Sequence, residues 1–342
     1  MTQSGESQRA ALEPLVAAKR ELSQQLLQSP DRRAVRAFAA VSPAPTDNVV
    51  AVGIGEKIAD GRPTGETAVK LFVRVKYAAS ELDSEHMLPT QHRGFTTDVE
   101  EIGLVRPFTT TVASAAAARI NPRRRMRPAQ PGASIGFRDP ANAFVMAGTF
   151  GALVHDPNGQ YILSNNHVLA DENGLAAGAP IFQPGLLDGG NPATDKIAEL
   201  TRFVALQTAG ANSVDCAIAR VLNPADASNA ILKIGPPMGV AAAAIDMIVH
   251  KFGRTSGYTV GRVTSVDTDV VVTYGIGNVT FTQQVIIQST GTQPFSKAGD
   301  SGSLIVARQT HQAVALLFAG STTHTIANHI DAVLASLKVS LV

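Results

Sequence analysis

The chain has 342 residues, of which 44% are hydrophobic and 17% are charged, and its formal net charge is +1. A globally disordered chain needs low hydrophobicity and high net charge, so this class is excluded. The small net charge gives no overall field that would attract nucleic acid or an acidic substrate. Cys216 is the only cysteine, which excludes an intramolecular disulfide framework and a zinc site built from several cysteines.

Targeting and ligand-binding signals are sparse. No apolar run approaches the roughly 18–20 residues of a membrane-spanning helix, and residues 1–20 lack the basic start and apolar stretch of a secretory signal peptide. We therefore expect a cytoplasmic protein that contacts neither a membrane nor nucleic acid. No HExxH motif or Cys/His cluster occurs, so we expect no metal and no cofactor.

The N-terminal part of the chain predicts one helix and a small α+β unit. Residues 7–27 have a helical apolar stripe formed by Leu12, Leu15, Leu22 and Leu26. Pro14 suits a first helical turn, so the helix could begin there. Packing inside the protein is the favoured role for this stripe, over a membrane or partner contact.

The α+β unit spans residues 48–105. Strands are expected at 49–52, 69–76 and 95–102, with a turn at 61–65 and a short helix at 78–85. Gly53-Ile54-Gly55 follows a strand, but a dinucleotide-binding loop has to open a helix, and here a Gly-Arg-Pro turn follows. Nucleotide binding is therefore not expected at this position.

Residues 109–134 are rich in arginine and proline, and proline at this density opposes a regular helix. A solvated linker is the favoured interpretation, with a nucleic-acid contact or a processing site as alternatives. No aromatic residues are interleaved to stack on bases, which weakens the nucleic-acid alternative. The expected domains are residues 1–128, comprising the helix, the α+β unit and the linker, and residues 129–342.

From about residue 132 the pattern changes to short apolar runs separated by Gly, Asn, Asp and Pro, which is typical of a mainly β barrel or sandwich. The expected strands are 144–154, 161–164, 215–221, 247–252, 259–263, 270–274, 285–288, 304–307 and 313–319. Ile330, Val333, Leu334 and Leu337 predict a short helix near the end of the sequence.

The strongest local signal for chemistry surrounds Ser301. Residues 297–303 read Lys-Ala-Gly-Asp-Ser-Gly-Ser and precede an apolar run at 304–306. A nucleophilic serine needs a sharp turn and backbone N–H groups directed at the developing oxyanion. The flanking glycines permit such a turn and a close approach of substrate. The same residue types also form ordinary turns, so the motif by itself has moderate specificity.

A serine nucleophile needs a base, and the base needs an acid that orients it. His167 follows an expected strand, and Asp215 lies at the edge of another, before small and apolar residues. A buried carboxylate needs a partner, and an imidazole N–H would serve. The competing carboxylates lie in Gly/Pro/Asn-rich loops, where exposure is expected; they are Asp171, Asp188, Asp195 and Asp226.

In order and local sequence, these residues resemble the trypsin-like (chymotrypsin-fold) serine peptidases. The Gly-Asp-Ser-Gly around Ser301 matches the nucleophile motif of that family, and residues 215–219, Asp-Cys-Ala-Ile-Ala, resemble its Asp-x-Ala-(Leu/Ile) segment. Residues 163–168 (Leu-Ser-Asn-Asn-His-Val) and 253–257 (Gly-Arg-Thr-Ser-Gly) resemble the intracellular bacterial and plant branch that includes the Narrow Leaf 1 proteins. The resemblance covers roughly residues 132–342 and does not extend to residues 1–128.

This resemblance implies a chymotrypsin-like double β-barrel, with six-stranded antiparallel barrels at about 132–235 and 245–342 and the site between them. It implies a serine endopeptidase that hydrolyses protein or peptide substrates through an acyl-enzyme. Ser301 would be the nucleophile, His167 the general base and Asp215 the group that orients the imidazole. The N–H groups of Gly299 and Ser301 would form the oxyanion hole.

The resemblance also indicates specificity. Phe295, six residues before Ser301, would lie at the base of the S1 pocket with Ser296 beside it. No carboxylate occurs there, so a small or apolar P1 residue is expected instead of Lys or Arg.

Two positions and one missing feature depart from the family pattern. Asn166 and Ser303 stand where secreted relatives usually carry Ala and Gly. In zymogen-type relatives, the carboxylate that Asp300 matches pairs with a new N-terminus, and no Ile-Val activation terminus is visible here. Another group must hold Asp300, or the oxyanion loop would form only when a partner binds.

The same residues bear on other possible functions. A Gly-Asp-Ser esterase would carry its nucleophile near the N-terminus and a late Asp-x-x-His pair, which the histidines after Ser301 do not form. An α/β-hydrolase needs a strand–turn–helix around Gly-x-Ser-x-Gly, and the fifth motif position here is Ser303. A peptidase-like scaffold or binding protein with weak or no turnover is the main alternative from another class.

The role of residues 1–128 is open between an assembly module, a cover over the site and a substrate-recruiting domain. The helical stripe is too short to be stable alone and has to pack on its own chain or on a neighbouring subunit. We expect a homo-oligomer to which this region contributes contacts. The alternative is an inhibitory segment released by cleavage near Arg123–Arg127.

Overall fold

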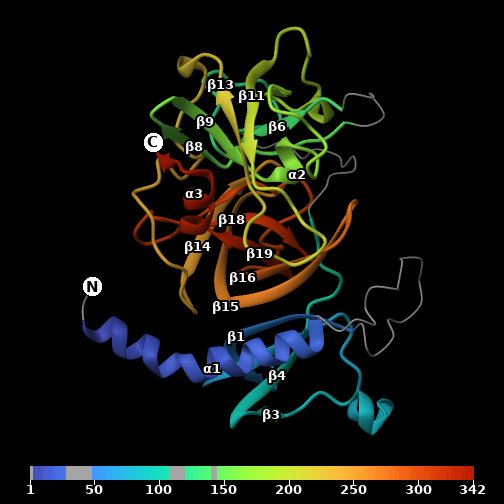
Figure 1. Cartoon of the computed structure of the whole chain (residues 1–342). Helices are drawn as coiled ribbons and strands as arrows, with labels where there is room; N and C mark the ends of the chain where they lie inside the picture. Colours follow the sequence, from blue (N-terminus) through green and yellow to red (C-terminus); the bar gives the residue numbers. More distant parts are fainter. Residues whose placement is uncertain (1–2, 28–47, 108–119, 140–144) are drawn as a thin grey trace.

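The computed structural model describes residues 3–27, 48–107, 120–139 and 145–342 (Figure 1). Among them, no helix combines the length and apolar character needed to cross a membrane. The described chain forms two large, curled β-sheets, so the mainly β, double-barrel fold class predicted from the sequence is confirmed. The strand numbers differ from the expected six in each barrel, because both sheets recruit strands from distant parts of the chain.

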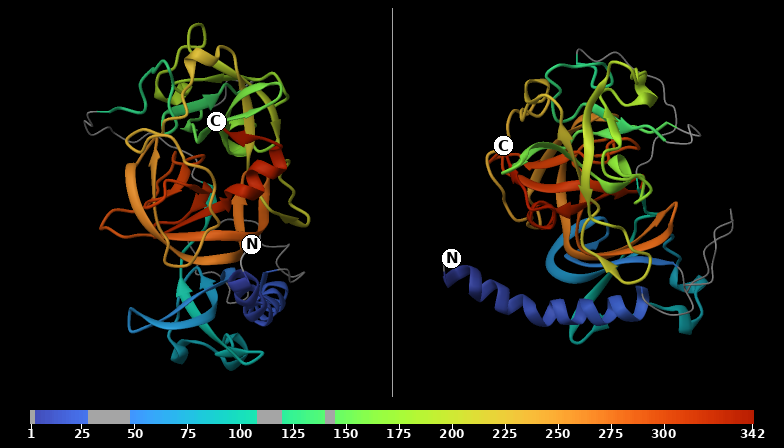
Figure 2. Two further views of the ribbon diagram at one scale, coloured as in Figure 1. Left: turned by 90° about the vertical axis from the view of Figure 1, so that its left-hand side faces the viewer. Right: turned by 45° about the horizontal axis from the view of Figure 1, so that its top comes forward.

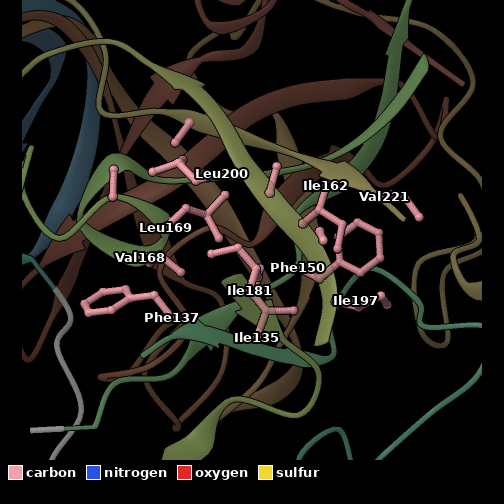
Figure 3. Packing of buried hydrophobic residues seen from close by; sticks show 14 of the residues in the cluster. Ile135, Phe137, Phe150, Ile162, Val168, Leu169, Ile181, Ile197, Leu200 and Val221 are labelled. Carbon is pink, nitrogen blue, oxygen red and sulfur yellow. The ribbon is translucent and has the colours of Figure 1, made fainter. Parts of the chain in front are cut away.

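The first sheet has eight strands in the order β20-β8-β9-β13-β11-β10-β6-β7, all paired antiparallel. Alternate side chains of its strands point inward and form an apolar core that includes Ile135, Ile162, Ile181 and Leu200 (Figure 3). The strands are β6 (Ser134–Phe137), β7 (Gly148–Thr149), β8 (Ala152–Asp156), β9 (Gly159–Ser164), β10 (Pro180–Phe182), β11 (Lys196–Phe203), β13 (Ala217–Val221) and β20 (Ser340–Leu341).

The second sheet has twelve strands, and six of them form its centre. These six are β14 (Ile248–Gly253), β15 (Gly257–Tyr274), β16 (Gly277–Ser289), β17 (Leu304–Ala307), β18 (Ala313–Gly320) and β19 (His324–His329). The strands expected at 259–263 and 270–274 are one continuous strand, β15, which stays paired with β16 through three register shifts. Such shifts bend a long strand, so β15 curves without ending.

Strands outside the expected barrel extend the second sheet. β1 (Val49–Ala59) pairs antiparallel with β15, and β2 (Arg62–Val73) and β4 (Phe95–Glu101) continue the sheet outward to β3 (Gln91–His92). β5 (Arg106–Pro107) pairs with β18, and β12 (Ala211–Asn212) pairs with β16. The α+β unit expected before the barrels is therefore part of the second sheet, although its boundary at residue 128 remains a prediction.

Apolar side chains of both sheets meet in one cluster that fixes the sheets relative to each other. Leu163 of β9 and Cys216, just before β13, pack in one cluster with Leu304 and Leu316 from the second sheet. The predicted C-terminal helix, α3 (Ile330–Leu337), adds its buried face to this cluster and leads into β20 of the first sheet. The cluster therefore fixes the positions of the chain segments that end next to it.

The N-terminal helix α1 (Gln3–Leu27) lies along the outer side of the N-terminal strands (Figures 1 and 2). Leu15 and Leu22 belong to the same buried cluster as Val52 and Leu71, so the described side chains of the apolar stripe are covered by the chain itself. The buried ammonium of Lys19 lies 2.6 Å from Asp269 of β15 and fixes the helix further. Pro14 lies within α1, so the interpretation that it marks the helix start is wrong.

Two smaller expectations also change. The helix expected at 78–85 is two short 3-10 turns, η3 (Ala79–Glu81) and η4 (Ser84–His86). The described part of the arginine-rich segment is docked and not a solvated linker. Arg125 Nε lies 2.9 Å from Asp195 Oδ1, and Arg127 Nη1 donates to Gln183 Oε1 at 2.6 Å.

Candidate active site

The pairing of β9 with β13 brings His167 and Asp215 together. Ala217 of β13 is opposite Ser164 at the end of β9. His167 follows β9 in the one-turn helix α2 (Asn166–Leu169), and Asp215 precedes β13. Both predicted site residues therefore lie at the same end of two neighbouring strands of the first sheet.

Their side chains make a direct, buried contact. His167 Nδ1 lies 2.5 Å from Asp215 Oδ2, and both side chains are fully shielded from solvent. Because the carboxylate can only accept, Nδ1 carries the proton and Nε2 is left as the basic nitrogen. Among the described residues Nε2 has no hydrogen-bond partner. This is the tautomer that a general base requires.

Asp215 is held by further donors that satisfy its buried charge. The N–H groups of Asn166 and His167 donate to Oδ1 at 2.6 and 3.4 Å. The hydroxyl of Tyr274 donates to Oδ2 at 2.7 Å. The prediction from sequence that this aspartate is buried with an imidazole partner is thus seen in the structure, whereas Tyr274 carries no motif that would reveal it.

Ser301 lies in the turn between β16 and β17. Gly299 and Gly302 on either side have φ angles of 93° and 90°, which glycine adopts without steric cost. A Cβ on Gly302 would also collide with Ser164 Oγ and Thr149 O. The two glycines of the motif are therefore required by the turn and by its close packing against the first sheet.

The structure brings Ser301 to the same region but not into a hydrogen bond with His167. A Cβ built on Gly148 would meet both Val168, the neighbour of His167, and the backbone oxygen of Ser301. The Ser301 hydroxyl donates to the Phe318 carbonyl oxygen at 3.2 Å, and the residue is buried. Catalytic hydrogen bonds are often long or misaligned without substrate, so this geometry is compatible with a serine that turns toward Nε2.

The predicted oxyanion donors are available. Within the described chain, neither the Gly299 N–H nor the Ser301 N–H donates to another protein group. Both are buried in the turn, where an unpaired donor is costly, so an oxygen acceptor on a ligand would satisfy them.

Lys251 of β14 provides the group that holds Asp300. Its ammonium lies 3.3 Å from Asp300 Oδ2, and both side chains are fully buried. The same carboxylate accepts from the Ser256 hydroxyl at 2.5 Å and from the Lys297 N–H at 2.9 Å. Burial lowers the pKa of Lys251, and the charge of Asp300 opposes that shift. A buried lysine from within the chain is therefore the group that holds Asp300.

The two residues expected in the S1 pocket are both buried. Phe295 packs in the apolar core of the second sheet, and its ring centroid lies 5.5 Å from the Lys251 ammonium. The Ser296 hydroxyl lies 2.5 Å from Thr325 Oγ1. In this structure Phe295 shields the Lys251–Asp300 pair, a role the motif position alone did not suggest.

The expectation that the competing carboxylates are exposed is wrong for two of them. The side chains of Asp188 and Asp195 are 5% and 7% exposed because arginines neutralise them. Arg254 binds Asp188 through two contacts of 2.7 and 2.5 Å. Neither carboxylate contacts His167, so Asp215 stays the acid partner. No group of three potential metal ligands converges in the part of the chain that the structure describes.

Comparison with family models gives no match, and comparison with curated proteins gives none either. Among solved structures, the chain is similar to a glutamic acid specific serine protease at 17% identity, covering 62% of this chain and 100% of that one with a TM-score of 0.44. Thermobifida fusca Protease A is 16% identical, covering 62% and 97% of the two chains, with a TM-score of 0.44. A Cellulomonas bogoriensis chymotrypsin is 16% identical over the same shares, with a TM-score of 0.42.

Proposed function

We propose that this protein is a serine endopeptidase that cleaves protein or peptide substrates through Ser301, His167 and Asp215. The observation that carries the proposal is the buried His167–Asp215 contact, which leaves Nε2 as an unpaired base. A buried imidazole without a partner on its second nitrogen is costly. A hydrogen bond from the Ser301 hydroxyl to Nε2 would remove that cost and activate the hydroxyl.

The proposed reaction proceeds in two halves. Ser301 Oγ attacks the scissile carbonyl carbon while His167 Nε2 takes its proton, and the N–H groups of Gly299 and Ser301 stabilise the oxyanion. His167 then protonates the leaving amine, which departs and leaves an acyl-enzyme. Water attacks the acyl-enzyme by the same route and releases the acid. Asp215 keeps Nδ1 protonated throughout and stabilises the imidazolium.

A peptidase-like scaffold with weak or no turnover is the second candidate. The observation that favours it is the hydrogen bond from Ser301 to Phe318 O, which directs the hydroxyl to a carbonyl oxygen. In a scaffold this bond would be permanent. In an enzyme it breaks when substrate binds, and reactivity toward a small electrophile separates the two cases.

A fluorophosphonate probe tests this directly. We expect one label per chain, located at Ser301 by peptide mass spectrometry, and none in Ser301→Ala or His167→Ala. Ser228→Ala, which changes a serine in the segment between β13 and β14, serves as the matched control and should label like the wild type. Labelling that is absent from the native protein, or equal in the native and heat-denatured protein, would contradict an activated serine.

Several finer statements remain predictions. They are the relationship to the Narrow Leaf 1 branch, the small or apolar P1 preference, the cytoplasmic location and the homo-oligomer. For the homo-oligomer, α1 no longer supplies an argument, because its described apolar side chains are covered by the strands of the same chain.

A further inference from the structure

Tyr274 lies at the end of β15, far from the sequence motifs, yet it is bonded to the acid of the candidate triad. Its hydroxyl donates to Asp215 Oδ2 at 2.7 Å, and the same oxygen accepts from His167 Nδ1 at 2.5 Å. The Tyr274 ring meets the His167 ring edge-on, with centroids 6.0 Å apart. Two donors, one from α2 and one from β15, thus share one carboxylate oxygen.

The tyrosine is held rigidly. It is buried, and its ring packs on Phe281 with centroids 6.0 Å apart, while Phe281 in turn packs on Phe318 at 4.7 Å. Tyr274 pairs with Gly277 across the β15–β16 hairpin, which fixes its backbone. Burial and the charge of Asp215 raise the pKa of Tyr274 well above its ordinary value, so the hydroxyl keeps its proton.

On the premise of the proposed peptidase function, we propose that Tyr274 is a positioning residue that orients Asp215 and weakens the proton affinity of His167. A hydroxyl donated to Oδ2 stabilises the negative charge on that oxygen. Less of that charge is then available to stabilise the imidazolium of His167. Tyr274 would keep the base neutral, and therefore competent, at lower pH than His167 and Asp215 alone would.

The test is the titration of His167, measured by NMR on full-length protein carrying ¹⁵N-histidine, with its signal identified by its loss in His167→Gln. Tyr274→Phe keeps the packed ring and removes only the donor, so we expect the His167 pKa to rise by about 0.5–1 unit. Two further titratable groups interact electrostatically with the Tyr274–Asp215 pair. Cys216 interacts with Asp215, and Glu172 interacts with Tyr274. Replacement of the four tyrosines by 3-fluorotyrosine, a stronger donor, should shift the pKa the opposite way.

Tyr161→Phe is the matched control, because Tyr161 is also buried and donates to an aspartate, Asp156, at 2.9 Å in the first sheet. It should leave the His167 titration unchanged. An unchanged His167 pKa in Tyr274→Phe would overturn the proposal even if the fluorophosphonate labels Ser301. A shifted pKa with no labelling would instead retain the coupling and reject the peptidase function.

A separate observation concerns β5. One edge of β18 pairs with β19, and at its other edge Ala319 and Gly320 pair antiparallel with Pro107 and Arg106. Phe318, the next residue of β18, presents the carbonyl that accepts from Ser301. The segment from the N-terminal region therefore occupies the strand edge immediately beside the candidate nucleophile.

Extended peptides commonly bind by adding a strand to such an edge. A substrate whose scissile carbonyl reached Ser301 would meet β18 at Phe318 and continue along Ala319 and Gly320. We infer that β5 occupies this substrate edge in the resting chain and leaves it when an extended peptide binds. The contact suits a reversible cover, because the pairing is two residues long and Val105, buried beside it, is its apolar anchor.

Hydrogen exchange of the wild-type chain distinguishes the outcomes. A small fluorophosphonate should react without changing amide exchange at Val105 and Arg106, whereas a peptidyl phosphonate of four residues should increase it there. Val105→Asp should raise the reaction rate of the peptidyl probe several-fold and leave the small probe unaffected, with Arg106→Ala, an exposed side chain, as the control. Unchanged exchange after peptidyl labelling would overturn the inference, and failure of both probes would reject the peptidase function with it.

Discussion

Replacing Ser301 with alanine is expected to lower kcat/KM for any hydrolysed peptide by on the order of 10⁴-fold or more. The substitution removes the hydroxyl that is proposed to attack the scissile carbonyl and to give its proton to the unpaired Nε2 of His167. The fold should be retained, because the single hydrogen bond lost is the one to Phe318 O. Progress curves with a peptide substrate found by library profiling, together with thermal melting, measure both effects.

The residues of a triad act as a unit, so their losses should not add. His167→Ala alone should cost about as much as Ser301→Ala, and the double variant should lose less than a further tenfold. Any remaining rate would come from the N–H groups of Gly299 and Ser301. If Ser301→Ala hydrolyses peptides like the wild type, or if the two losses multiply, the three residues do not form one catalytic unit.

Local sequence was sufficient to predict the parts of the site that depend on neighbouring residues. The Gly-Asp-Ser-Gly turn, the strand that ends shortly before His167 and the strand that begins after Asp215 are each defined by residues close together in the sequence. The glycine spacing of the turn reflects a steric requirement, since a side chain at Gly302 collides with Ser164. These features could be predicted because each depends on residues that are close together in the sequence.

The partners that complete the site come from distant strands and could not be read in this way. Lys251 and Asp300 are brought together by the fold of the second sheet, and Tyr274 reaches Asp215 through a hairpin that bends around the core. The sequence expectation split that hairpin strand in two, because polar residues between 263 and 270 interrupt its apolar pattern. The pairing of β1 with β15 is equally non-local, which is why the N-terminal unit was expected to be separate.

Lys251→Met is expected to reduce both activity and stability strongly. The substitution keeps the length of the side chain but leaves the fully buried Asp300 without its cation. Loss of one partner from a buried ion pair costs about 3–5 kcal/mol of the free energy of unfolding. Asp300 lies between Gly299 and Ser301, so its displacement also disturbs both oxyanion donors. A loss of such donors lowers kcat by about 10²–10³-fold.

Lys196→Met provides the matched control, because its ion pair with Glu199 is exposed, with 40% of the Lys196 side chain accessible. Such a pair contributes at most about 1 kcal/mol, so this variant should melt and hydrolyse like the wild type. In Lys251→Met combined with Asp300→Asn, the unpaired charge is removed and much of the lost stability should return. Activity should not return with it, since the ion pair that sets the loop is gone. If Lys251→Met keeps its activity within about threefold, the backbone N–H groups that bind Asp300 are sufficient to hold the oxyanion loop, and the cation is dispensable.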